Sequence, residues 1–452
     1  MQRINCDERP NYVDIVNQQG LVYTHEDPLN GEPTLYRYWR ENAYYSFTLA
    51  EITALEEAAT AVFDMCIEAG DWLLSDAGRS TLGRFNIPVY ALKAVIDSWN
   101  EAPECGSVYG RFDFRFGGFN HPDPSQRIPQ LYEFNADTPT SLVESTIQWT
   151  WLENTGNGNS QFNDLHNRLI AAWTRNLDLI TQKIGHKPVV YFMCTSKDPS
   201  HEDEMNTVVM LDTCQQAGYE VRTLYIDNED NLWIGEDGRY YDKQRNQHIE
   251  VAFKLYPWEH MAHDENARDL FADMENAGYA EPYNGGTIWI EPPYKMLWST
   301  KAILPVLWML FGSDPDRSKY LLPSWFEGEV PLQGLAKTGY ARKPILSREG
   351  ADITLVIPGQ ENIEGEVQHY GEEGFIIQEL AEPPKFFRMD EQKEVYTVLG
   401  VWMVDGEPAG MGIRESDGPI TDNFSNFVPH SIVDGPVHYT HTPVGASALI
   451  RV

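Results

Sequence analysis

Apolar residues recur at helical spacing through much of the first hundred positions of the chain. Residues 45–69 are rich in Ala, Glu, Leu and Ile spaced three or four positions apart, and residues 87–99 repeat the pattern. The N-terminal region is therefore predicted to be mainly helical. Similar spacing predicts further helices at residues 141–152, 165–183, 202–217 and 301–311.

Two stretches that follow the first helices have the alternation of β-strands. They cover residues 110–116 and 130–134, and Gly, Pro, Asn and Asp are frequent in residues 117–129 between them. This pattern predicts a β-hairpin. Downstream, strands expected at 188–194 and 219–225 enclose a helix, which is the order of a βαβ unit with parallel strands.

The chain becomes strand-rich toward its C-terminus, after a polar, hairpin-like stretch at residues 228–247. With 452 residues it exceeds what one hydrophobic core usually organises, so two or three packed subdomains are expected. A sheet that follows an α/β half is typical of a mixed-sheet nucleotide-binding protein, and the predicted class is mixed α/β. The expected C-terminal strands are 339–345, 353–357, 374–379, 395–404 and 411–414.

The composition is that of a globular but strongly acidic protein. Hydrophobic residues make up 42% of the chain, and Asp plus Glu outnumber Lys plus Arg by 68 to 34, for a formal net charge of −34. Such a surface repels nucleic acids and anionic membranes, and neither is expected as a partner. It would attract a polycation such as a polyamine, although the demand for solubility alone accounts for most acidic proteins.

The cysteines and the N-terminus indicate a cytoplasmic protein. The five cysteines are odd in number and contain no Cys-x-x-Cys pair, which favours reduced thiols over a disulfide framework or a zinc site. The first residues lack the apolar stretch of a signal peptide, and the longest apolar run, residues 302–311, is too short to span a bilayer. The cysteines are Cys6, Cys66, Cys105, Cys194 and Cys214.

The expected hairpin carries the densest chemistry. Side chains alternate between the two faces of a strand, so Arg111, Asp113 and Arg115 share one face of the first strand, and Glu133 and Asn135 share one face of the second. If the strands pair, two carboxylates and an amide oxygen converge, a ligand set suited to Mg²⁺, and Arg111 could contact a transferring phosphoryl group. The alternative is a hairpin with a solvated polar face.

Two lysines farther along the chain are candidates for binding phosphate. Lys343 stands in an expected strand before a loop that contains Gly350, and a lysine with loop backbone N–H groups can hold phosphates. Lys301 begins an expected helix, where a cation is electrostatically unfavourable unless an anion lies nearby. The alternatives are an exposed lysine on an edge strand and a solvated lysine.

Two strand ends complete the set of candidates. Gln378, Glu379 and Leu380 close a buried strand, where backbone groups could bind an adenine edge, or where the chain simply leaves the sheet. Arg414 follows a segment with two glycines, which permits close approach to a ligand; the alternative is a surface arginine at a sheet edge.

Taken in order, these motifs resemble the synthetase domain of the glutathionylspermidine synthetase family, which are ATP-grasp carbon–nitrogen ligases. The resemblance spans residues 109–432 approximately. The motifs that carry it are Arg111-Phe-Asp113, Tyr132-Glu133-Phe-Asn135-Ala136-Asp137, Lys301-Ala-Ile-Leu-Pro305, Lys343-Pro344 with Arg348 and Gly350, Gln378-Glu379-Leu380, and Pro408-Ala409-Gly410 ahead of Arg414.

The resemblance implies a role for each matching residue in the nucleotide and phosphoryl site. It implies that Asp113, Glu133 and Asn135 bind magnesium, and that Arg111 and Arg414 stabilise the phosphoryl group and the tetrahedral intermediate. The ATP-binding residues that it implies are Lys301, Lys343, Arg348, Gly350, Gln378, Glu379 and Leu380.

The substrate region is where the sequence departs from the family pattern. Thr138 and Thr140 occupy positions at which the family has serines that contact the thiol-peptide substrate. Glu202 and Asp203 match the acidic pair that contacts the polyamine, although Glu204 replaces one of them in another alignment. The resemblance therefore implies ATP more firmly than it implies glutathione or spermidine.

The activity implied is that of an ATP- and magnesium-dependent acid–amine ligase that releases ADP. A carboxylate, which is a peptide in the family, would become an acyl phosphate, and an amine, a polyamine in the family, would displace the phosphate. The expected architecture is an ATP-grasp fold with a preceding α/β domain and helical N-terminal elements.

The expected division of the chain is 1–160 for the helical region with the hairpin, 161–300 for an α/β substrate domain and 301–452 for the nucleotide-binding region. There is no room or motif for the amidase domain that accompanies bifunctional members, so a stand-alone synthetase, monomeric or homodimeric, is expected. Two alternatives stay open: an ATP-binding regulatory or scaffold protein without ligase turnover, and a kinase-like phosphotransferase with a stable product.

Overall fold

The computed structural model describes the chain over residues 1–21, 28–29, 32–33, 38–101, 107–198, 200–228, 230–330, 332–422 and 424–434. Cys6, Cys66, Cys194 and Cys214 are free thiols, and Cys105 lies outside these ranges. Among the helices of the described part, none combines the length and apolarity that a bilayer crossing requires.

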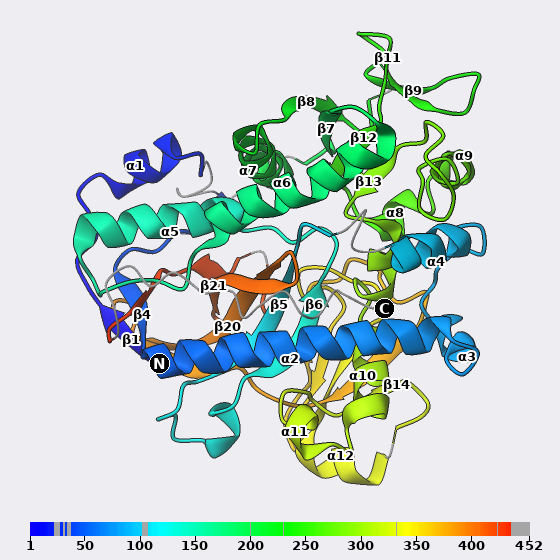
Figure 1. The fold of residues 1–452 in the computed structure, drawn as a ribbon. Helices are drawn as coiled ribbons and strands as arrows, with labels where there is room; N and C mark the ends of the chain where they lie inside the picture. Colours follow the sequence, from blue (N-terminus) through cyan, green and yellow to red (C-terminus); the bar gives the residue numbers. More distant parts are fainter. Residues whose placement is uncertain are drawn as a thin grey trace.

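The longest helix, α2 (Leu49–Leu74), runs along one side of the molecule (Figure 1). It begins at a capping box, because the Thr48 hydroxyl accepts the Glu51 N–H at 3.2 Å and the Glu51 carboxylate accepts the Thr48 N–H at 3.0 Å. The helix was expected from residue 45, but Ala43–Phe47 forms strand β4, which suits its two tyrosines and its phenylalanine. Likewise, α4 (Leu92–Glu101) starts after Pro88 rather than before it.

The central sheet has the strand order β22-β21-β20-β5-β6, and β19 also pairs with β20. The predicted hairpin is confirmed: β5 and β6 are antiparallel, with Arg111 opposite Asn135 and Asp113 opposite Glu133. The other neighbour of β5 is β20, from the C-terminal part of the chain, so one sheet unites distant segments. The strands are β5 (Tyr109–Arg115), β6 (Gln130–Asn135), β19 (Lys385–Arg388), β20 (Lys393–Val404), β21 (Glu407–Ser416) and β22 (Asn426–Phe427).

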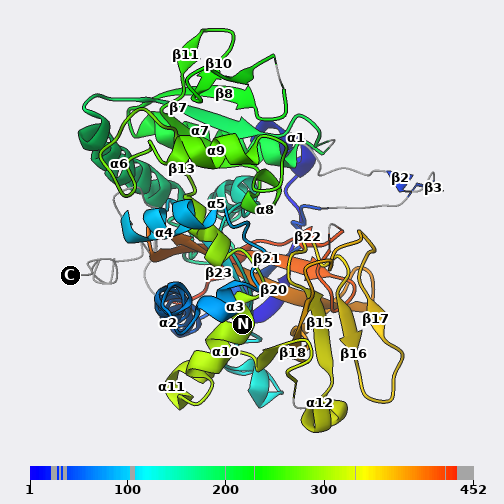
Figure 2. The same cartoon turned by 90° about the vertical axis from the view of Figure 1, so that its right-hand side faces the viewer.

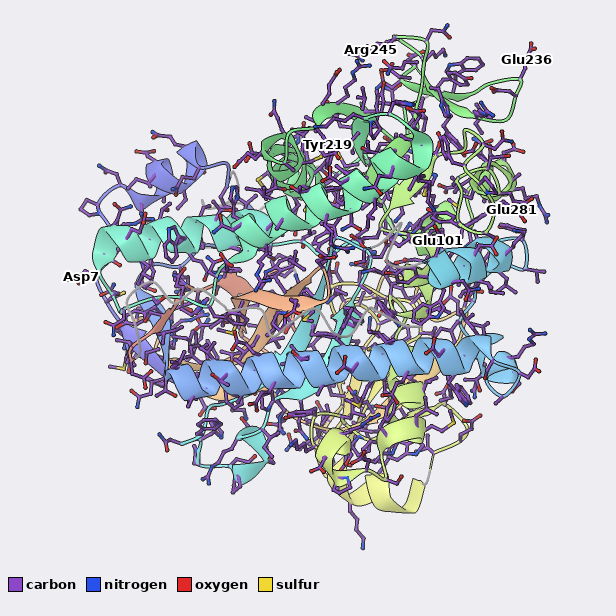
Figure 3. The ribbon with its side chains drawn as sticks, viewed as in Figure 1. Asp7, Glu101, Tyr219, Glu236, Arg245 and Glu281 are labelled. Atoms are coloured by element: carbon purple, nitrogen blue, oxygen red, sulfur yellow. The ribbon has the colours of Figure 1, made fainter. Side chains whose placement is uncertain are left out.

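A second sheet, of order β13-β12-β7-β8, contains only parallel pairs, which confirms the predicted βαβ unit. Its strands are β7 (Val189–Cys194), β8 (Glu220–Tyr225), β12 (Val251–Leu255) and β13 (Ile288–Ile290), with helices α6 (Leu165–Ile184) and α7 (Glu202–Gln216). The polar stretch after β8 forms the small sheet β9 (Leu232–Ile234), β10 (Tyr240–Asp242) and β11 (Gln247–His248). This sheet projects outward, with Glu236 and Arg245 at its tip (Figure 3).

A third sheet, of order β14-β18-β15-β16-β17, lies across the central sheet from the parallel one (Figure 2). Its strands are β14 (Ser324–Phe326), β15 (Tyr340–Pro344), β16 (Thr354–Val356), β17 (Ile363–Glu364) and β18 (Phe375–Glu379). Helices α10 (Ile303–Phe311), α11 (Pro315–Ser318) and α12 (Leu332–Thr338) accompany it.

Smaller elements close the ends of these layers. Strands β1 (Gln2–Asn5), β4 and β23 (His430–Ile432) form a three-stranded sheet, and β2 (Pro28–Leu29) pairs with β3 (Glu32–Pro33). The remaining helices are α1 (Tyr12–Gln18), α3 (Arg79–Leu82), α5 (Leu142–Thr155), α8 (Trp258–Met261), α9 (Ala267–Met274) and the 3₁₀ turns Pro124–Gln126 and Pro293–Leu297.

The aromatic core beneath the hairpin fixes its position. The Phe112 and Phe134 rings, one from each hairpin strand, lie with their centroids 4.1 Å apart, and the Tyr109 ring stacks on Trp402 of β20 at 6.1 Å. All four side chains are buried. Phe112 and Phe134 lie on one face of the hairpin, whereas Tyr109 and Trp402 lie on the other face with Arg111, whose Cζ is 5.6 Å from the Trp402 ring centroid.

Candidate functional site

A cavity of about 240 Å³ opens between the central sheet, the β14–β18 sheet and the start of α7. Every residue predicted for the site lines it, although these residues come from segments far apart in the sequence. They are Arg111, Asp113, Glu133, Asn135, Thr138, Thr140, Glu202, Asp203, Lys301, Lys343, Arg348, Gly350, Gln378, Glu379, Leu380 and Arg414. The structure thus brings the predicted residues together, while the role of each stays a prediction.

The hairpin register brings the three predicted metal ligands side by side. The Asn135 amide nitrogen lies 3.2 Å from Asp113 Oδ2 and 3.4 Å from Glu133 Oε1. An amide rotated by 180° would present its oxygen at the same point, and these side chains would then offer three hard oxygen donors to one position. Within the described residues, no cluster of three or more His, Cys, Asp or Glu could hold a metal ion. A magnesium ion here would depend on this amide and on phosphate oxygens or water, which is its usual coordination.

Two arginines bracket the Asp113 carboxylate. Arg111 donates to it from Nε at 2.8 Å and from Nη2 at 3.3 Å, and Arg414 forms an ion pair with Asp113 Oδ2. Arg111 also donates from Nη1 to the Thr140 carbonyl at 2.8 Å, which links the hairpin to the loop that follows β6. Both guanidinium groups are therefore held in fixed positions at the cavity wall.

Gly400 of β20 makes room for this arrangement. It pairs with Asp113 across the sheet, and a Cβ atom at position 400 would lie 2.8 Å from Arg111 Cδ. A side chain here would push Arg111 from its place, which gives a physical reason for a glycine in the interior of a strand. No motif in the sequence marks Gly400 as part of the site.

Two lysines complete the cationic end of the cavity. Lys301, just ahead of α10, donates to the Ser347 carbonyl at 2.7 Å and lies 3.3 Å from Glu133 Oε2. Lys343 of β15 donates to Gln378 Oε1 at 2.7 Å, and burial lowers the pKa of Lys343 to about 8. Burial also acts to raise the pKa of Glu133, but Lys301, Lys343 and Arg414 outweigh it and lower that pKa to about 2.

The charge at this end is unbalanced in favour of cations. Arg111, Lys301, Lys343 and Arg414 face two carboxylates, Asp113 and Glu133, which leaves a surplus of two positive charges. Such a surplus, in a wall partly shielded from water, favours an anion that carries several charges.

The strand end predicted for adenine lies on the other side of Lys343. The Gln378 side chain bridges Lys343 and the Ser324 hydroxyl, to which it donates at 3.2 Å. The Leu380 N–H donates to the Gly339 carbonyl at 3.1 Å. This N–H group already has a partner in the protein, so other groups of residues 378–380 would have to contact a purine edge.

Arg348 and Gly350 lie in the loop after β15. Arg348 donates to Thr138 Oγ1 at 2.9 Å and to Glu259 Oε1 at 3.0 Å, so it contacts the loop that follows β6. Gly350 has φ +72°, and a Cβ there would lie 2.6 Å from Ile420 Cγ2, so both backbone conformation and packing require glycine. Glu259 was not among the predicted residues.

At the far end of the cavity, Glu202 and Asp203 occupy the first turn of α7. Burial raises the pKa of Glu202 to about 7; a hydrogen bond with Thr140 opposes this rise, and the carboxylates of Glu144 and Glu349 add to it. Burial likewise raises the pKa of Asp203 to about 6. A nearby cation would favour the ionised form of both carboxylates.

Glu204, the alternative member of the acidic pair, points elsewhere. It accepts a hydrogen bond from the Tyr225 hydroxyl at 3.2 Å and lies 3.1 Å from His201 Nδ1, and its side chain is exposed. The structure therefore places Glu202 and Asp203, rather than Glu204, at the cavity.

The arrangement of sheets is shared with an ATP-grasp protein. The structure is similar to that of a glutathione synthetase-like effector from Globodera pallida in its apo form, with a TM-score of 0.55, and the match covers 94% of this chain and 98% of that one. The sequences are 11% identical, so this likeness concerns the fold alone. The predicted mixed α/β, ATP-grasp class is confirmed.

Sequence relatives define the class more closely. The chain belongs to the glutathionylspermidine synthase preATP-grasp family, whose model matches residues 3–433. It is 31% identical to a Haemophilus influenzae protein provisionally named an acid–amine ligase, over 94% of this chain and 98% of the relative. The predicted family is confirmed, and the chain is related to acid–amine ligases.

Longer relatives match over part of their length. The chain is 26% identical to the bifunctional glutathionylspermidine synthetase/amidase of Escherichia coli, over 86% of this chain and 59% of that protein. It is 27% identical to the trypanothione synthetase of Crithidia fasciculata, over 81% of this chain and 53% of that protein. The activities that these names state are those of the two relatives.

The Gly400→Ala substitution should weaken binding of a polyanion. Because the new methyl group would lie 2.8 Å from Arg111 Cδ, the guanidinium must move from its partners. We expect the dissociation constant of magnesium tripolyphosphate, measured by calorimetry, to rise roughly tenfold, the equivalent of one charge-assisted hydrogen bond. Gly334→Ala is the matched control, because nothing lies within 4 Å of its Cβ position. Equal affinities in the two variants would contradict this account of Gly400.

Proposed function

We propose that the protein is an ATP- and magnesium-dependent acid–amine ligase, which releases ADP and joins its substrates through an acyl phosphate. One observation carries this proposal. A single cavity has a surplus of cations around two carboxylates at one end and a pair of carboxylates with raised pKa at the other. The first end suits a polyphosphate, and the second suits a cationic amine.

Asp113, Glu133 and Asn135 would hold the magnesium ion at the phosphoryl end. When bound, this ion would neutralise negative charge on the phosphate oxygens. Arg111 and Arg414, fixed on Asp113, would face the phosphoryl group as it passes to the substrate carboxylate. Since they are already oriented, no reorganisation would be needed during the reaction.

Lys301 and Lys343 would hold the ATP phosphates, and residues 378–380 would lie along the adenine. Support comes from their place on one wall, with Glu379 and Leu380 extending the surface that begins at Lys343 and Gln378. Arg348 and Gly350, in the adjoining loop, would close over the phosphates only if Arg348 releases Thr138 and Glu259.

The acid substrate would lie against Thr138 and Thr140, and the amine would lie against Glu202 and Asp203. The loop carrying the threonines joins the phosphoryl end to the α7 end, so a carboxylate held there is within reach of both partners. By analogy with the relatives, the acid would be a peptide and the amine a polyamine.

The function is tested by the dependence of ADP release on both substrates. Purified protein with ATP and Mg²⁺ is incubated with pools of peptides and of amines, and ADP and amide are measured. We expect ADP only when an acid and an amine are both present, and a hydroxamate when hydroxylamine replaces the amine. Tight ATP binding without turnover in any pool would favour a regulatory protein, and a stable phosphoester would favour a phosphotransferase.

Loss of the Arg414 guanidinium should nearly abolish ADP formation. Arg414→Ala removes a cation that contacts Asp113 at the phosphoryl end, and we expect kcat to fall by about 10²–10³-fold. Asp113→Asn should act similarly, through loss of a metal ligand and of the partner of Arg111. Arg342→Ala is the control, since Arg342 pairs with Glu327 at the surface, away from the cavity. Wild-type rates in Arg414→Ala would contradict the assignment.

The affinity for the amine should fall as the pH is lowered through 7. Glu202, with a pKa of about 7, and then Asp203, with a pKa of about 6, become neutral and lose their attraction for a cation. We expect the KM for the amine to rise up to roughly tenfold per pH unit between pH 7 and 6 and more steeply below pH 6, with the KM for ATP as the internal reference.

Two variants separate this effect from other titrations. Glu202→Gln should have a raised KM for the amine and a flatter pH dependence, because the group that titrates near pH 7 is absent. Glu204→Gln, on the same helix but facing Tyr225, should behave as the wild type. A pH profile unchanged by Glu202→Gln would contradict the role of Glu202.

A further inference from the structure

A buried ion pair joins Asp137, which lines the cavity, to Lys254 of β12. The exposed fraction of the Lys254 side chain is 0% and that of Asp137 is 1%. Lys254 Nζ donates to both carboxylate oxygens, at 2.8 and 3.0 Å, and the Trp258 backbone N–H donates to Oδ2 at 2.8 Å. The ammonium also lies 4.3 Å from the centroid of the Trp258 ring.

Asp137 and its partner Trp258 belong to two segments that line different walls of the cavity. Asp137 itself precedes Thr138 in the loop after β6, whereas Trp258 is the first residue of α8 and precedes Glu259. Glu259 in turn accepts a hydrogen bond from Arg348, which also donates to Thr138. One carboxylate therefore fixes the substrate loop and α8 relative to each other.

The same loop is connected to the phosphoryl end. Its Thr140 carbonyl accepts from Arg111 at 2.8 Å, and its Ala136 carbonyl accepts from the buried Lys295 at 2.7 Å. Lys295 also donates to the Tyr109 carbonyl, at the start of β5, at 3.0 Å. A shift of the loop would therefore move the carbonyl that orients Arg111.

Stability alone does not account for the ion pair. Desolvation makes a buried ion pair costly, and apolar residues of similar volume can often replace one without loss of stability. A pair at this position does something that apolar residues cannot, because the Asp137 carboxylate is also the acceptor for the α8 N–H group.

We propose that Lys254 and Asp137 are positioning residues for the proposed ligase reaction. They fix residues 136–140 against α8, and through this loop they set the places of Thr138, Thr140 and Arg111. The inference rests on the proposed function for its kinetic consequence, but the anchoring itself can be measured without turnover.

The kinetic test uses the double variant Lys254→Met/Asp137→Leu, which replaces the pair by apolar groups. We expect a modest loss of thermal stability, because the Trp258 N–H loses its acceptor, while kcat/KM for the acid substrate found in the pool screen falls about 100-fold, as expected for misplacement of reacting groups. The dissociation constant of the magnesium complex of a non-hydrolysable ATP analogue should rise less, by at most about tenfold, because Lys301 and Lys343 are untouched and only the Arg111 contact is disturbed.

The matched control is Arg9→Met/Glu41→Leu. That pair is also buried, with Arg9 Nε 2.9 Å from Glu41 Oε2, but it does not line the cavity. At a thermal stability equal to that of Lys254→Met/Asp137→Leu, this control variant should have the kcat/KM of the wild type. A stable Lys254→Met/Asp137→Leu protein with wild-type kcat/KM would overturn the positioning role alone, whereas a wild-type protein without turnover would overturn the ligase.

Hydrogen exchange gives a second measurement that needs no substrate. The double variant has no carboxylate to accept the Trp258 N–H, so we expect exchange in peptides covering residues 136–142 and 256–262 to accelerate at least tenfold, and not in the control. Should Lys254→Met/Asp137→Leu fold poorly, Asp137→Asn, which keeps one oxygen acceptor, should accelerate exchange to a lesser degree. Unchanged exchange in both variants would overturn the anchoring.

Discussion

The pairing of Asp113 with Glu133 across the β5–β6 hairpin is the constraint on which the site depends. Two carboxylates on adjacent strands repel each other, and removal from water makes each more costly, by several kcal/mol for an unpaired buried charge. The fold compensates them with Arg111 of the hairpin itself and with cations from three other places in the chain: Arg414 from β21, Lys301 before α10 and Lys343 from β15. The C-terminal segments thus complete a charge arrangement that the hairpin begins.

One cavity then holds carboxylates in opposite electrostatic environments. Glu133, surrounded by cations, has a pKa lowered to about 2, whereas Glu202, buried near other carboxylates, has a pKa raised to about 7. The first stays ionised and can help to bind a metal ion and phosphates. Burial disfavours the ionised form of Glu202, and a bound cation would stabilise that form. An anionic and a cationic reactant would therefore each find a separate end of the same space.

Local spacing in the sequence predicts only part of this arrangement. Alternation along residues 111–115 and 130–135 places the charged side chains on one face and predicts the hairpin. The start of α2 was predicted too early, because the aromatic residues of β4 also fit the apolar spacing of a helix. Gly400 and Glu259 have no local signal, since each acts through an arginine far away in the sequence. Lys254 lies within the apolar run of β12, so its charge requires a buried anion as partner. The sequence does not show which anion this is, because Asp137 approaches Lys254 only where the parallel sheet packs near the central sheet.

The contacts between the central sheet and its two neighbouring sheets set the relative positions of the cavity walls. The 11% identity with the Globodera pallida effector shows that this arrangement of sheets tolerates almost complete replacement of the sequence. What must be kept for a given reaction is the relative position of three walls: the hairpin, the β15–β18 wall and the α7–α8 end. The hairpin is joined to the β15 wall by Lys301 and Glu133, and to α8 by Asp137. Thr138 and Glu202 lie on the surface between these joints, so substitutions there would alter the proposed substrate contacts and leave Asp113 and Glu133 in place.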